Sequence, residues 1–210
     1  MSTESKDYPL RFSVDYPEKL DRLTTFFRAF TIIPILIIFS ALAVSFTSST
    51  GSGGSSQGYS AAVIITTVPL VLMLLFRKKY PKWWFDWNLA VTRFGMRVGV
   101  YALLLRDEYP STDEEQAVHL DIDYPDAEKD LMRGMPLVKW FLAIPHYIVL
   151  TFLWIAAMVC WIIAWWAILF TGRFPRGLWD FIVGFCRWEL RVCAYAVLLV
   201  TDRYPPFSLD

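Results

Sequence analysis

The chain has 210 residues, of which 56% are hydrophobic, 17% aromatic and 19% charged, and its formal net charge is zero. Soluble domains are typically about 45–50% apolar and about a quarter charged, so this composition indicates an integral membrane protein. A net charge of zero gives no global field that would attract nucleic acid, and we expect no nucleic-acid partner.

The first predicted element is a short strand near the N-terminus. Apolar Leu10, Phe12 and Val14 alternate with polar residues, a period typical of a half-buried strand. Asp-Tyr-Pro at residues 15–17 follows, and the proline ends the pairing. Residues 1–19 are polar and acidic, without the apolar core of a signal peptide, so we expect the N-terminus on the cytoplasmic side.

The next element is an apolar segment at residues 29–77, which predicts a helical hairpin. Residues 31–46 and 61–76 carry almost no charge. Each is slightly shorter than the ~18 residues of a typical span, but aromatic and cationic residues extend both. The Gly/Ser-rich linker 47–60 contains no Lys or Arg, whereas cations flank the hairpin on both sides. The positive-inside rule then places both ends in the cytoplasm and the linker outside.

Residues 82–106 predict an amphipathic helix that lies in the membrane interface. Pro81 precedes it, at a position where a missing N–H costs nothing, and Asp86 lies near the positive end of the helix dipole. Arg93 and Arg97 are four residues apart and share one stripe, while the other faces are apolar. Two arginines are costly at a bilayer centre, so we place this helix at the cytoplasmic surface.

The second half of the chain repeats the first. FSVDYPEKLDRL at residues 12–23 resembles LDIDYPDAEKDL at residues 120–131. One constant spacing of 94 residues relates Pro81 to Pro175, Asp86 to Asp180, Arg93 to Arg187, Arg97 to Arg191 and Tyr101 to Tyr195. We therefore predict two tandem units, 1–110 and 111–210. The second has its own strand, an apolar segment at 137–170 and an interfacial helix at 176–201, and the two strands are expected to pair antiparallel.

The apolar segment 137–170 allows more than one interpretation. As a single helix it would be about 51 Å long, which exceeds a normal span. Compared with the first unit, it lacks about the length of the Gly/Ser linker. A tight hairpin turning near Ala157–Val159 would return GRFPR to the same side as RKK, and we favour it. A re-entrant hairpin and one long helix are the alternatives.

The two arginine stripes and the tryptophans of the interfacial helices are the candidate functional residues. They would contact anionic lipid headgroups or a partner, or else form internal salt bridges, because charges at membrane depth usually pair. The tryptophans suit a headgroup-level belt. The full set is Arg93, Arg97, Arg187, Arg191, Asp86, Asp180, Trp83, Trp84, Trp179 and Trp188.

No catalytic chemistry is visible in the sequence. Gly-x-Ser-x-Gly, a phosphate-binding loop and Cys-x-x-Cys are all missing, and we expect neither enzymatic activity nor a cofactor. His146 has no second histidine or carboxylate near it in sequence, so a metal site is unsupported. We interpret it as an interfacial or hydrogen-bonded residue, or as a polar position in a pore.

The stretches LAIPHYIVLTFLWIAA and AWWAILFTGRFPRGLWDFIVGFCRWELRVCAYAVLLVTDRYPPFSL resemble the domain-of-unknown-function family numbered 4389, a group of prokaryotic membrane proteins. The first unit departs from that pattern: it lacks Phe-Thr-Gly-Arg and Pro-His, and it gains the Gly/Ser linker. Tandem units are familiar in the family. The resemblance implies a multi-pass protein of the prokaryotic inner membrane but no activity.

We therefore expect a mainly α-helical integral membrane protein without enzymatic activity. It would be a scaffold or accessory subunit of a larger membrane assembly or homo-oligomer, in contact with lipid headgroups. The alternative is a channel or a lipid or small-solute transport protein that forms by oligomerisation. Its apolar segments offer few polar residues to line a path, although duplicated units are common among transporters.

Overall fold

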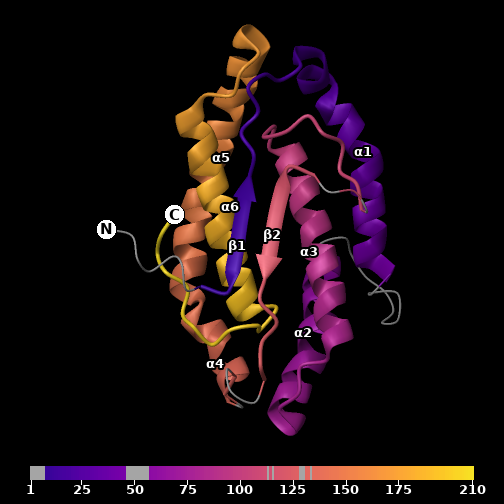
Figure 1. Ribbon diagram of the computed structural model, residues 1–210, viewed down its shortest axis with the longest axis vertical. Coiled ribbons are helices and arrows are strands. Elements are labelled where there is room, and N and C mark those ends of the chain that lie inside the picture. Colours follow the sequence, from indigo (N-terminus) through magenta and orange to yellow (C-terminus); the bar gives the residue numbers. More distant parts are fainter. Residues whose placement is uncertain (1–7, 46–56, 113, 115, 128–130, 133) are drawn as a thin grey trace.

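The computed structural model describes residues 8–45, 57–112, 114, 116–127, 131–132 and 134–210 (Figure 1). Most of the predicted Gly/Ser linker, and with it the expected outside loop, lies beyond the described residues. The elements in chain order are β1 (Leu10–Val14), α1 (Arg22–Ser45), α2 (Gln57–Arg77), α3 (Lys82–Ala102), β2 (Val118–Ile122), α4 (Met135–Leu142), α5 (Ile144–Thr171) and α6 (Arg176–Ala196).

The two predicted strands form one antiparallel pair. Leu10 lies opposite Ile122 and Phe12 opposite Leu120. These four side chains are buried, whereas the residues between them along each strand are exposed. The alternation seen in the sequence is therefore confirmed, and its cause is that successive side chains of a strand point to opposite faces.

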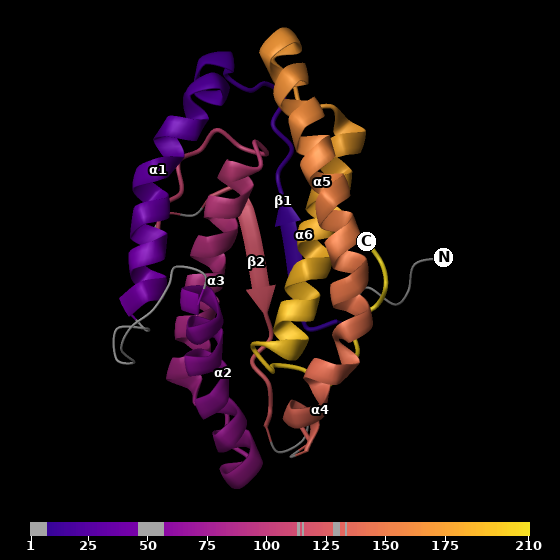
Figure 2. The same ribbon diagram turned by 180° about the vertical axis from the view of Figure 1, so that it is seen from behind.

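The molecule has three layers (Figures 1 and 2). The strand pair forms the front layer, and α3 and α6 lie behind it, with α3 packed on β2 and α6 packed on β1. The third layer contains α1 and α5, which pack on α3 and α6 respectively. Each middle helix thus contacts the strand that belongs to the other half of the chain.

The two middle helices begin where the sequence predicts them and end earlier. Pro81 and Pro175 adopt an extended conformation immediately before α3 and α6. Leu104 and Leu199 have φ angles of 65° and 54°, in the left-handed region that L-residues avoid in helices. These residues turn the chain out of the helix before the predicted ends at 106 and 201.

The turn predicted near Ala157–Val159 is wrong, because α5 is a single helix of 28 residues. No glycine or proline interrupts this helix after Pro145, and a turn in an apolar setting would leave backbone groups without hydrogen bonds. The chain bends instead at Ala143, between α4 and α5. Within the described residues, α5 is the one helix long and apolar enough to cross a membrane.

The apolar segment of the first half is arranged differently from the predicted hairpin 29–77. Figures 1 and 2 show α1 and α2 following one another along one side of the molecule, not lying side by side over their lengths. Both helices find partners in the second half, since α1 packs on α5 and α2 packs on α4. The two helices also contact each other, so the first half packs both within itself and on the second half.

The two halves of the chain make matching contacts around the sheet. The hydroxyl of Tyr16 donates to the carbonyl oxygen of Phe174, just before α6. The hydroxyl of Tyr124 donates in the same way to the carbonyl oxygen of Tyr80, just before α3. The tyrosine of each Asp-Tyr-Pro turn therefore makes a hydrogen bond to the segment just before a middle helix and fixes where that helix begins.

Candidate functional site

The arginines of α3 and α6 hold the outer edges of the strand pair. Arg93 donates from Nε to the carbonyl oxygen of Leu120 at 2.8 Å and pairs with Asp121 at 2.9 Å. Arg187 donates from Nε to the carbonyl oxygen of Phe12 at 3.2 Å. Carbonyl groups at these positions point away from the partner strand, so the arginines close edges that would otherwise be open to another strand.

The second arginine of each stripe also binds the chain itself. Arg97 donates to the carbonyl oxygen of Ser111 at 2.6 Å. Arg191 is buried and donates to the carbonyl oxygens of Ser208 and Asp210. All four predicted arginines therefore make internal hydrogen bonds, mostly to backbone carbonyl groups that sequence spacing does not reveal.

The predicted aspartates do not join these arginines. Asp86 and Asp180 are both exposed, and Arg93 pairs with Asp121 instead. Contact of these two carboxylates with lipid or a partner stays a prediction.

The four predicted tryptophans have different surroundings. Trp83 is 65% exposed and Trp84 is half-buried, which is compatible with a membrane interface. Trp179 and Trp188 are buried within the chain. Trp179 packs edge-on against Tyr16, with ring centroids 5.4 Å apart. The two buried rings cannot belong to a headgroup belt, because the opposite layers of the fold cover them.

His146 lies in the interior, at the start of α5. Its side chain is fully buried, and its Nδ1 accepts a hydrogen bond from Nε1 of Trp188 at 3.1 Å. The ring stacks on Phe207 with centroids 4.0 Å apart. His146 is therefore hydrogen-bonded inside the single chain, and a pore position for it stays a prediction.

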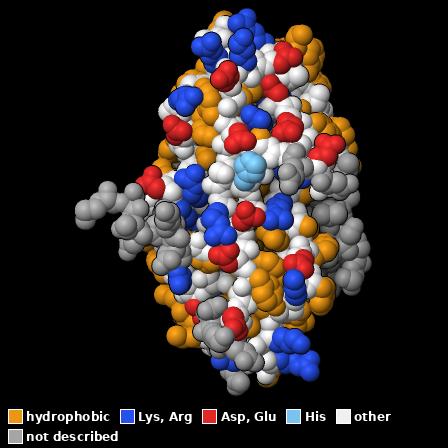
Figure 3. All heavy atoms as spheres, viewed as in Figure 1, with side chains coloured by type: hydrophobic (Ala, Val, Ile, Leu, Met, Phe, Trp, Pro, Cys, Tyr) orange, Lys and Arg blue, Asp and Glu red, His pale blue; other side chains and the backbone are white. Residues whose placement is uncertain are grey.

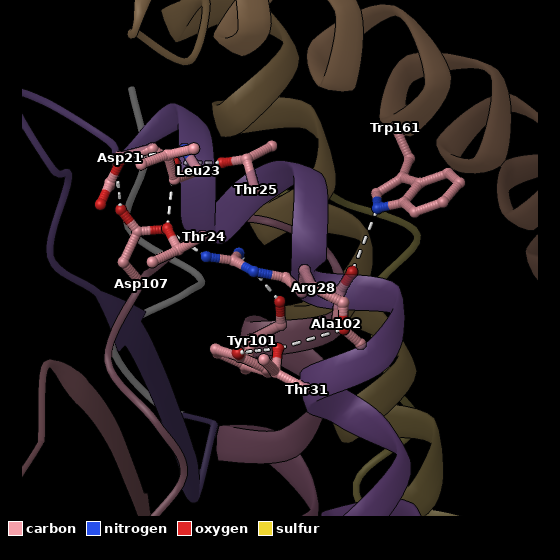
Figure 4. A network of polar contacts seen from close by, with 10 residues as sticks. All are labelled: Asp21, Leu23, Thr24, Thr25, Arg28, Thr31, Tyr101, Ala102, Asp107 and Trp161. Atoms are coloured by element: carbon pink, nitrogen blue, oxygen red, sulfur yellow. Dashed lines mark hydrogen bonds and ion pairs between the residues drawn. The ribbon is translucent and has the colours of Figure 1, made fainter.

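Two buried cations form networks that the sequence analysis missed. The guanidinium of Arg28, on α1, pairs with Asp107 and donates to the carbonyl oxygen of Tyr101 at 3.1 Å (Figure 4). It also lies over the Tyr101 ring, 4.5 Å from the centroid. Asp107 in turn accepts a hydrogen bond from the backbone N–H of Asp21 at 2.7 Å, at the start of α1. One carboxylate thus caps a helix and neutralises a buried charge.

Lys139, on α4, occupies the equivalent position in the second half. Its ammonium pairs with Asp202 at 2.7 Å and donates to the carbonyl oxygen of Thr201 at 2.7 Å. It lies 5.2 Å from the centroid of the Tyr195 ring, and Asp202 accepts the backbone N–H of Met132 at 2.6 Å. The sequence contains a signal for this: Arg28 and Lys139 each stand six residues before a proline, Pro34 and Pro145, which end the similar stretches TIIP and LAIP.

Open depressions lie next to these networks and between the helices: Arg28 lines one of them, and Thr201 and Asp202 line another. A groove of about 530 Å³ runs between α5 and α6, and a second, of about 490 Å³, lies between α1 and α5. The third, of about 500 Å³, is polar and lies at the end of the sheet, next to Arg11 and Asp123. Those two residues already pair with each other at 2.7 Å. Among the described residues, no three His, Cys, Asp or Glu side chains gather in a way that could hold a metal ion.

The groove between α5 and α6 contains an ionisable group in an apolar setting. Its lining residues are Tyr147, Leu150, Thr151, Trp154, Phe185, Glu189, Val192, Cys193 and Val197. Glu189 is an exposed residue, and the apolar side chains around it remove part of the hydration of its carboxyl group. This desolvation raises its pKa above the usual value for a glutamate. Burial, with the nearby Glu189 charge, raises the pKa of the Cys193 thiol to about 12.

Comparison with known proteins gives one family match, over part of the chain, and no activity. A family model described as a domain of unknown function (DUF4389) matches residues 135–208, which comprise α4, α5, α6 and the segment after them. No curated protein and no solved structure matches the chain.

Proposed function

Residues 135–208 match the model of this domain family of unknown function, and from that premise we propose that the chain is a non-enzymatic membrane protein, a scaffold or accessory subunit. The observation that carries the proposal is the division of its surface into two unlike faces. Lys, Arg, Asp and Glu side chains cover the sheet face, and hydrophobic side chains appear mainly along its margins (Figure 3). The opposite face is built from helices (Figure 2), and among them α1 and α5 expose large hydrophobic side chains.

The apolar face is far larger than a soluble monomer exposes. Soluble proteins rarely show contiguous apolar patches above a few hundred Å². On α1 the exposed large side chains are Leu23, Phe26, Phe27, Phe30, Ile33, Leu36 and Ile37; on α5 they are Ile144, Tyr147, Ile148, Phe152, Trp154, Ile155, Val159, Ile162, Ile163, Trp166 and Phe170. Lipid is the environment that satisfies such a surface, and anionic headgroups suit the cations at its ends, among them Arg22, Arg77, Arg173 and Arg176.

The charged sheet constrains how this face meets the bilayer. The strands run alongside α5 (Figures 1 and 2), so a bilayer perpendicular to α5 would place the strand charges in the hydrocarbon of a single copy. Those charges include the exposed pairs Arg11–Asp123 and Arg93–Asp121. Charges at that depth are costly. A single copy avoids the cost when its apolar helices enter lipid and its sheet faces water on the cytoplasmic side of a prokaryotic inner membrane.

Duplication is part of the proposal. The matched tyrosine contacts, the matched cation networks and the arginines on both strand edges support two tandem units related by an approximate two-fold axis. In a scaffold, such a pair would offer two similar polar surfaces to a partner or to another copy.

Cysteine labelling in liposomes tests the orientation. Ser13 is exposed on the sheet, whereas Phe152 is 69% exposed on α5. A water-soluble maleimide should label Ser13→Cys and leave Phe152→Cys unmodified until detergent is added. Equal labelling of both sites in intact liposomes would reject lipid contact of the apolar face. A native mass spectrum of gently solubilised protein tests the scaffold role, which a strictly monomeric protein without partners would contradict.

A transport protein formed by several copies is the second candidate. The length and hydropathy of α5 favour it, since this helix could cross a bilayer in a multi-pass arrangement. The charged sheet faces of several copies would then have to meet around a shared axis, away from lipid. Ion flux into liposomes that falls after Arg93→Ala would support this candidate, and absence of flux from a reconstituted oligomer would reject it.

A further inference from the structure

The groove between α5 and α6 combines a carboxylate with aromatic walls. Tyr147 and Trp154 come from α5, and Phe185 comes from α6. Among the described residues that line the groove, Glu189 is the one carboxylic acid. Most of the remaining lining is aliphatic, so the groove is an apolar channel with a single acidic group.

Glu189 has no counter-charge within the described part of the chain. Desolvation is the cause of its altered pKa, and no hydrogen bond or neighbouring cation offsets it. The nearest arginines in sequence turn the other way: Arg187 bonds to β1 and to the carbonyl oxygen of Leu209, and Arg191 bonds to the chain end. Glu189 is exposed at the groove, so its carboxylate is open to a ligand, and a cation bound there would form a charge-assisted contact with it.

The aromatic rings suit the same ligand. The face of an aromatic ring is electronegative and attracts ammonium groups, and quaternary ammonium compounds are often bound between such rings and a carboxylate. The groove volume of about 530 Å³ is within the range of small-molecule sites. Next to it, Ile148 and Ile155 lie on the exposed stripe of α5, which offers apolar surface for an alkyl chain.

We propose that this groove binds a cationic amphiphile, with its ammonium group at Glu189 between the aromatic rings and its alkyl chain along α5. The ligand enters from the lipid side, because the groove opens beside the apolar face. This site requires neither catalysis nor a second copy of the chain, and it goes beyond the scaffold role.

Binding of decyltrimethylammonium to the full chain in a non-ionic detergent tests the proposal. Native mass spectrometry counts the bound copies across a titration, and we expect one saturable copy on the wild-type protein. Glu189→Gln should weaken binding about tenfold, because it removes the ion pair and leaves the rings. Asp180→Asn is the matched control, since it makes the same change at an exposed position of α6 outside the groove.

A steric variant locates the ligand independently of charge. Thr151 lines the groove and is exposed, so Thr151→Trp should fill the groove without altering the core and should abolish saturable binding. Decyl sulfate should not bind saturably. Equal affinity of the wild type and Glu189→Gln, or equal losses in Glu189→Gln and Asp180→Asn, would overturn the proposal. So would a dimer that forms through Glu189 and excludes the ligand, because a second copy would then be the occupant.

Discussion

Replacing Asp202 with asparagine isolates the energy of a buried charge in this fold. Lys139 is completely buried, and Asp202 is the acid it pairs with, with 13% of its side chain exposed. Breaking a buried pair typically costs about 3–5 kcal/mol, because the remaining charge keeps its desolvation penalty. An alternative for the protein is to release the lysine proton, which costs about 4.6 kcal/mol at pH 7 from an ordinary lysine pKa. We therefore expect a loss of about 3 kcal/mol and an upper limit of about 4.6 kcal/mol.

The size of this loss should depend on pH in a defined direction. Burial already lowers the pKa of Lys139, and removal of Asp202 lowers it further. The folded variant then binds fewer protons than the unfolded chain, so its stability rises with pH until lysine titrates in the unfolded state near pH 10.4. At pH 9 the upper limit falls to about 1.9 kcal/mol. The difference in stability between wild type and Asp202→Asn should shrink accordingly.

Guanidinium unfolding followed by tryptophan fluorescence in a mild detergent measures this difference at pH 7 and pH 9. Asp123→Asn is the control, because it breaks the exposed pair with Arg11 and should cost less than about 1 kcal/mol at both values. The double variant Lys139→Met/Asp202→Asn should regain much of the stability, since no charge remains buried. Equal costs for Asp202→Asn and Asp123→Asn, or a cost independent of pH, would refute the reasoning.

Three further outcomes follow from buried groups elsewhere. Gly184→Ala should destabilise the fold by about 1–3 kcal/mol in the same unfolding assay, because its new Cβ would lie 2.7 Å from the carbonyl oxygen of Leu209. The control, Gly177→Ala, has open space around the new Cβ and should be neutral or slightly stabilising. Burial raises the pKa of Tyr80, whose hydroxyl donates to a backbone carbonyl, so the folded state keeps this proton after the unfolded chain loses it. The free energy of unfolding should therefore fall as pH rises above about 10, and Tyr80→Phe should make this fall less steep. Burial raises the pKa of the Cys186 and Cys193 thiols to about 12, so little reactive thiolate is present at pH 8. Alkylation of both should be slow until the protein unfolds, and rapid labelling of either in the native protein would contradict this.

The local sequence pattern predicted the strands and the helix starts correctly, because each of these depends on residues that are close together in the chain. The alternation of Leu10 and Phe12 predicted the strand and its buried face, and prolines predicted the starts of α3 and α6. The turn near Ala157–Val159 was wrong because it relied on a length comparison with the first half and on the charge rule for membrane topology. Neither takes account of tertiary packing, and α5 packs along α6 as one uninterrupted helix.

The sequence by itself determined the secondary structure around the sheet and the apolar character of α1 and α5, and it predicts two similar halves. Only the tertiary structure decided where the charges go: Arg93 and Arg187 to strand edges, and Lys139 into the interior with Asp202. The physical reason is that periodicity is a property of neighbouring residues, whereas the cost of a charge depends on which distant segments cover it. Lys139 and Asp202 are far apart in the chain, and the folding of α4 against α6 brings them together.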